Sequence, residues 1–171
     1  MGAAAVSIPV ISALSQVKAA ALDFSTIKTV EQFGKQVIGR ADLSRLACEI
    51  ALKQSVRADA KEFATYELME AETVIDVLNH LGVATPVMGK DALGVLDHIR
   101  NSEGVAFDKA YIGAEYENHV FLRDLASAYL KNSAGSQSVD ERHGRQLASL
   151  ALFAFTEHAA ITHRISQSIT A

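Results

Sequence analysis

Residues 105–131 read VAFDKAYIGAEYENHVFLRDLASAYLK, and this stretch decides the fold class. A helix turns by about 100° per residue, so residues three or four positions apart share a face. One face of this stretch is apolar and carries Phe107, Tyr111, Ala114, Leu122, Leu125, Ala126 and Tyr129. Glu115, Asn118 and His119 fall in the same sector. The pattern predicts an amphipathic helix whose buried face holds ionisable side chains.

Three more long helices are predicted, over residues 30–55, 58–81 and 138–168. Gly82 is a typical C-terminal stop, and Ser138 with Glu141 forms a capping box for the last helix. The connection over residues 83–104 is long, and residues 91–99 are predicted to form a short helix within it. A long connection can cross the length of a bundle, whereas a short one joins antiparallel neighbours. We therefore expect an all-α, ferritin-like four-helix bundle with a long crossover connection.

The N-terminus is predicted to be a separate amphipathic extension over residues 1–25, with the bundle domain at 26–171. Its stripe of Val6, Val10, Ile11, Leu14, Val17 and Ala21 has helical spacing. The segment lacks the positive start of a signal peptide, although residues 19–21 resemble a cleavage site, so an export signal is the alternative. The first bundle helix has a second apolar sector through Leu43, Leu46 and Ile50. We expect this sector to be covered by the extra N-terminal helix or by a second chain in a homodimer.

Composition narrows the class of protein. The chain has 171 residues, of which 49% are hydrophobic and 21% charged, which suits one globular domain. The net charge of −4 comes without a basic patch, so we expect no nucleic-acid partner. No apolar run reaches the roughly 18 residues of a transmembrane segment. The single cysteine, Cys48, is predicted to be a small buried hydrophobe.

The candidate functional residues are ionisable side chains at buried positions near the middle of three helices. On the second helix, Glu67 lies at the centre of the apolar face and Glu70 near its edge. Glu115 and His119 are neighbours on the third long helix, since they are four residues apart. His158 lies within the stripe Leu147, Leu150, Ala151, Ala154, Ile161 and Ile165 of the last helix, and His143 falls on the same side. A buried charge is costly unless it is paired or binds a metal.

Two interpretations of this cluster remain open. Carboxylates and imidazoles from facing helices suit one iron, manganese or zinc ion. The chain has no Glu-x-x-His, so the paired di-iron pattern is not reproduced. The first helix contributes Ser44 to the interior, whereas Glu49 falls in a solvated stripe. The other interpretation, which the sequence favours, is a non-enzymatic bundle whose buried polar network also includes Tyr111 and Tyr116.

Several stretches resemble the DUF4142 family of bacterial ferritin-like four-helix proteins. They are Ala51-Leu52-Lys53-Gln54-Ser55, Ala60-Lys61-Glu62-Phe63-Ala64 and Phe107-Asp108-Lys109-Ala110-Tyr111-Ile112, followed by His119 and His158. The resemblance implies the bundle fold and export to the periplasm or beyond, and it names no substrate. For the non-enzymatic interpretation we expect a stress- or envelope-related role. The family often has Glu where Ser44 stands, and Asp-His where Glu70-Ala71 stands.

Overall fold

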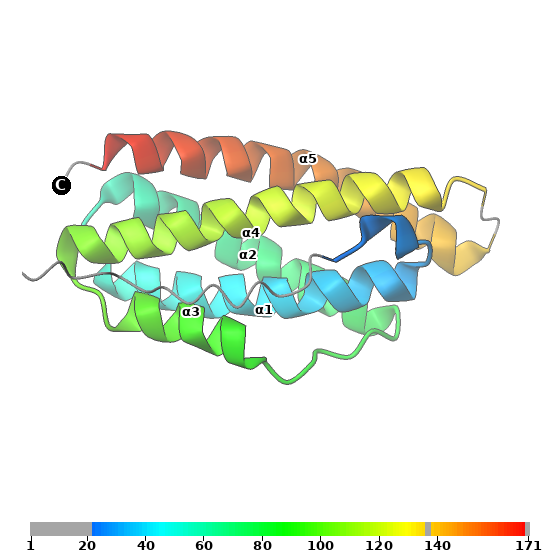
Figure 1. Cartoon of the computed structure of the whole chain (residues 1–171), viewed down its shortest axis with the longest axis horizontal. Helices are drawn as coiled ribbons and strands as arrows, with labels where there is room; N and C mark the ends of the chain where they lie inside the picture. Colours follow the sequence, from blue (N-terminus) through cyan, green and yellow to red (C-terminus); the bar gives the residue numbers. More distant parts are fainter. Residues whose placement is uncertain (1–21, 136–137, 170–171) are drawn as a thin grey trace, which may run out of the picture.

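The computed structural model describes residues 22–135 and 138–169, and these residues form helices and connecting turns without any strand (Figure 1). The elements are the 3₁₀ turn η1 (Phe24–Thr26) and the helices α1 (Val30–Gln54), α2 (Ala58–His80), α3 (Lys90–Arg100), α4 (Gly104–Asn132) and α5 (Val139–Ser168). The all-α class and the five helix positions predicted from residue 30 onward are confirmed to within one or two residues. Of the predicted N-terminal extension over residues 1–25, residues 1–21 lie outside the described part of the chain, and Phe24 and Ser25 belong to the 3₁₀ turn η1.

The four long helices lie side by side, and the short helix α3 packs on the outside against α1 and α4 (Figure 1). The turns at both ends of the bundle make α1 and α2 antiparallel, and likewise α4 and α5. Figure 1 shows α2 and α4 running in the same direction, because the connection that includes α3 returns along the whole bundle. The predicted crossover is therefore present, and its physical consequence is that α1 packs against both α2 and α4.

The helix ends follow local sequence signals. Thr29 caps α1 through a capping box with Gln32. Gly82 adopts the left-handed conformation after α2, at a φ of 81°, as the predicted stop requires. Only half of the predicted capping box at α5 forms. The Ser138 hydroxyl accepts the Glu141 N–H, but the Glu141 carboxylate accepts the Val30 N–H at 2.8 Å and the Tyr129 hydroxyl at 2.9 Å. Glu141 thus joins the start of α1 to α4 and α5.

The second apolar sector of α1 is covered by the crossover connection. Leu43, Leu46 and Ile50 are half-buried and belong to the same hydrophobic cluster as Leu96 and Ile99 of α3. From the sequence, we expect the N-terminal helix or a second chain to cover this sector. The structure instead places α3 there, because α3 is amphipathic and packs directly over this face of α1.

The buried face of α5 is rotated from the predicted stripe. Ala148, Phe155 and Thr162 are buried, whereas Leu150 is 74% exposed and His143 lies at the surface. The prediction for Leu150 and His143 is therefore wrong. The helix carries apolar residues on most of its circumference, so its periodicity does not single out one face. None of the described helices is both long and apolar enough to cross a membrane.

Candidate metal site

Three buried side chains from three different helices converge at mid-bundle: Glu67 of α2, His119 of α4 and His158 of α5. Glu67 Oε2 lies 3.1 Å from His119 Nε2 and 2.8 Å from His158 Nδ1. The two imidazole nitrogens are 3.4 Å apart. One carboxylate oxygen and two ring nitrogens therefore form a compact triangle of potential donor atoms.

The rings of both histidines are fixed by their surroundings. His119 Nδ1 lies 2.7 Å from the carbonyl oxygen of Glu115, one turn earlier on α4. A carbonyl can only accept, so Nδ1 carries a proton and Nε2 is directed to Glu67. Phe63 packs edge-on against both imidazoles, with centroid separations of 5.9 Å to His119 and 5.3 Å to His158. Such packing restricts ring rotation and preorganises the donor atoms.

The other two predicted site residues flank the triangle rather than complete it. Glu115 Oε2 lies 3.6 Å from His119 Nδ1, on the far side of that ring, and it accepts a hydrogen bond from Ser44. Glu70 Oε2 lies 3.7 Å from His158 Nε2, again on the side of the ring away from Glu67. The two carboxylates thus lie beside the outer ring nitrogens, at distances slightly longer than a hydrogen bond.

Burial and mutual charge shift the protonation equilibria of the cluster. Burial alone would raise the pKa of Glu67, but the charge of His119 and the hydrogen bonds from both histidines lower it to about 2. Burial opposes the charged form of His119, yet the charge of Glu67 and its hydrogen bond raise this pKa to about 9. Burial, followed by the Glu67 charge, raises the pKa of Glu115 to about 7. Without a metal, the site therefore holds an ion pair between Glu67 and His119. The pKa of the nearby Glu115 carboxyl lies close to 7.

The triangle fits a transition-metal ion. A point about 2 Å from all three donor atoms, a typical metal–ligand distance for histidine and carboxylate, exists just outside their plane. An ion at such a point would have its three protein ligands on one side. A cavity of about 10 Å³ adjoins Glu67 and Glu70, and its size approaches that of one water molecule. The donor set, two imidazoles and one carboxylate, suits copper, zinc and iron.

Two of the predicted polar partners lie elsewhere. The Tyr111 hydroxyl lies 3.2 Å from the sulfur of the buried Cys48. The ring of Tyr116 is half-buried and packs against His163, with centroids 5.4 Å apart. Neither tyrosine has a hydrogen bond to the Glu/His cluster among the described residues. The expectation that they complete the network is therefore wrong. Ser44 does join it, through Glu115.

Asp108 is a further buried carboxylate, outside the set of candidate site residues predicted from the sequence. Its side chain is fully buried on α4, and Oδ1 accepts a hydrogen bond from Ser55 at the end of α1. Among the described atoms Oδ2 has no hydrogen-bond partner. The signal is present in the sequence, because Asp108 is seven residues before Glu115 and so shares its helical face.

Comparison with known proteins supports the fold. A solved structure described as "CopM in the Cu(II)-bound form" has a similar fold, with a TM-score of 0.67 over 82% of this chain and 97% of that one. The sequence identity is 14%, so the likeness concerns the helical fold alone. No family model and no curated protein matches the chain.

Proposed function

We propose that this protein binds a single transition-metal ion through Glu67, His119 and His158, and that Cu(II) is the ion it holds most tightly. The observation that carries the proposal is the convergence of three buried donor atoms from three helices. Two imidazoles and one carboxylate are an established ligand set for such ions. The flanking carboxylates Glu70 and Glu115 resemble the outer partners that orient histidine ligands in metal sites.

Two arguments favour copper over the iron, manganese or zinc considered from the sequence. Among divalent first-row ions, nitrogen and oxygen sites bind Cu(II) most tightly. The structural neighbour is described in a Cu(II)-bound form, and its fold extends over most of this chain. We infer a protein that holds copper, and the proposal includes no enzymatic step.

The proposal extends to the class of bundle. The parallel direction of α2 and α4 and the long crossover are typical of ferritin-like folds. We therefore retain the ferritin-like, DUF4142-like interpretation, together with the export that this resemblance implies, as part of the proposal. The alternative is a metal-free bundle in which the hydrogen-bonded Glu67–His119–His158 network serves only stability.

The test is titration of the chelator-treated protein with Cu(II), followed by elemental analysis and electron paramagnetic resonance. We expect about one tightly bound ion, with hyperfine structure from two imidazole nitrogens. His119→Gln and His158→Gln are each expected to abolish the tight site. His143→Gln is the matched control, because His143 is exposed on α5 and far along the helix from His158.

The result would be decisive in either direction. A wild-type protein that stays folded and binds Cu(II), Zn(II) and Fe(II) no better than the double variant His119→Gln/His158→Gln would contradict the proposal. Tight Zn(II) or Fe(II) binding without tight Cu(II) binding would support the site but overturn the choice of ion.

A further inference from the structure

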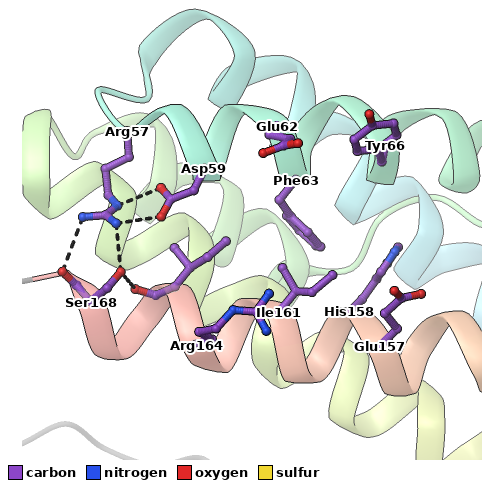
Figure 2. A pocket seen from close by; sticks show the side chains of 11 residues that line it. Arg57, Asp59, Glu62, Phe63, Tyr66, Glu157, His158, Ile161, Arg164 and Ser168 are labelled. Atoms are coloured by element: carbon purple, nitrogen blue, oxygen red, sulfur yellow. Dashed lines mark hydrogen bonds and ion pairs between the residues drawn. The ribbon is translucent and has the colours of Figure 1, made fainter.

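An open cleft of about 760 Å³ lies between α2 and α5 (Figure 2). Its apolar walls include Phe63 and Tyr66 from α2 and Ile161 and Ile165 from α5. Figure 2 shows Phe63 and His158 pointing from opposite helices into the space between them. His158 thus lines the cleft and also contributes a donor atom to the candidate metal site.

The three donor residues differ in their access to solvent. His119 is fully buried and Glu67 is 4% exposed, whereas His158 is 9% exposed. The exposed part of His158 faces the cleft, because its ring is part of the cleft wall. An ion in the cleft would therefore meet His158 before the other two ligands, and the Phe63 ring, which also lines the cleft, packs against both imidazoles.

The negative charge at the end of the cleft near His158 favours a cation. Glu157 is the neighbour of His158 on α5 and lines the cleft, and Glu70 lies 3.7 Å from His158 Nε2. At the other end, Arg57 is paired with Asp59 at 2.7 Å and also bonds to Ser168 (Figure 2). Glu62 and Arg164 line the cleft as well, with opposite charges. The acidic groups are thus closest to the ligand that would receive the ion.

We propose that the α2–α5 cleft is the passage through which the metal ion enters and leaves, with His158 as the first ligand to bind it and the last to release it. The inference rests on the proposed function of the Glu67–His119–His158 site. Transfer inward requires the His158 ring to turn out of its edge-on packing against Phe63, whose centroid is 5.3 Å away, into the adjoining cleft. Glu157 positions the incoming cation beside His158 without being a ligand in the final site.

If the cleft is the passage, residues in its wall control the rates of metal entry and exit, whereas residues with a purely structural role do not. Narrowing the passage raises the barrier for entry and exit alike, so the two rates fall by the same factor and the affinity is unchanged. Ile161→Trp places a larger side chain in the cleft wall. Cu(II) association, followed by stopped flow, and Cu(II) loss to excess chelator should both slow by about tenfold or more.

Two further variants test the details. Glu157→Gln should slow association about tenfold at low salt, with a smaller effect at high salt, since electrostatic steering is screened. Leu150→Trp is the control for adding an indole to α5, because Leu150 is exposed and lies outside the cleft. It should leave both rates unchanged.

The outcomes separate this inference from the proposed function. If the wild-type protein binds no ion at the site, the proposed function fails. If it binds tightly and Ile161→Trp, folded and with unchanged affinity, exchanges copper at the wild-type rate, the passage lies elsewhere and the inference is overturned. A variant with weakened affinity and an unchanged association rate would also overturn it, since Ile161 would then act on the site itself.

Discussion

The imidazole of His119 donates its Nδ1 proton to the backbone carbonyl of Glu115, one helical turn away, at 2.7 Å. This contact sets the tautomer, because once the ring is neutral its lone pair must reside on Nε2. Nε2 is the nitrogen that faces Glu67 Oε2, at 3.1 Å. A backbone group that cannot be removed by substitution thereby directs Nε2, the proposed metal-binding atom of the most deeply buried of the three residues, toward Glu67.

Copper affinity should rise with pH. The metal-free His119 has a pKa of about 9, because burial is outweighed by the charge and hydrogen bond of Glu67, so at neutral pH a proton must leave before the ion binds. The apparent affinity should therefore increase about tenfold per pH unit up to roughly that pKa. Competition with a chelator of known affinity between pH 6 and 8 measures the slope. An affinity that does not change with pH would show that His119 is neutral or is not a ligand.

Glu70 should tune the affinity through His158. When His158 binds through Nδ1, its proton resides on Nε2, which faces Glu70 at 3.7 Å. Removing this outer partner typically lowers metal affinity about 10-fold or more. Glu70→Gln should therefore weaken Cu(II) binding by about that factor, as measured by calorimetric titration. Glu72→Gln, an exposed position on the same helix, should have no effect. Equal affinities for both variants would exclude the orienting role.

The metal-free protein should lose stability as pH rises. His119, with its pKa raised from 6.5 to about 9, stabilises the fold fully below 6.5, and this contribution is lost as pH rises through 9. Glu115, with its pKa raised from 4.5 to about 7, favours the fold when protonated, so it also destabilises the fold as pH rises from 4.5 to 7. Glu67 acts in the opposite sense, but its contribution is lost only as pH falls from 4.5 through about 2.

Urea unfolding in the presence of chelator at pH 5, 7 and 9 tests this expectation. The free energy of unfolding should fall by on the order of 5 kcal/mol between pH 5 and 9, because His119 and Glu115 each contribute roughly half of the loss. Glu115→Gln should flatten the part of the curve below pH 7 and leave the part governed by His119. A free energy of unfolding that rises with pH over this range would contradict the assigned protonation states.

The burial of individual ionisable residues could be predicted from the sequence, because the direction of a side chain on a helix is a local property. Glu67, Glu115, His119 and His158 are all buried, as their helical periodicity indicates. The sequence alone does not establish that these side chains lie at the same level of the bundle. Their level depends on the relative axial positions of α2, α4 and α5, and these follow from packing along their whole length.

The failures have the same origin. The periodicity of α5 predicts that Leu150 is buried, but α5 is apolar on several faces. The face that is actually buried is the one on which Ala148 and Phe155 pack against other helices. The capping rule has Glu141 close its own helix end, but α1 provides the Val30 N–H as a tertiary partner. Periodicity and capping rules describe one helix at a time, so contacts between helices override them.

Close packing at Gly144 should make that position intolerant of any side chain. A Cβ at this residue would lie 2.6 Å from Val30 Cβ and 2.8 Å from the Tyr129 hydroxyl, which Glu141 holds in place. Both neighbours are constrained, so Gly144→Ala should destabilise the protein by about 1–3 kcal/mol through overpacking. Around Gly113, inside α4, a Cβ would meet no atom within 4 Å, so Gly113→Ala should instead stabilise the protein by about 0.5–1 kcal/mol. Urea unfolding of the two variants compares the same chemical change in two helices. If both substitutions shift the free energy of unfolding in the same direction, the close contact between α5 and the start of α1 is absent in solution.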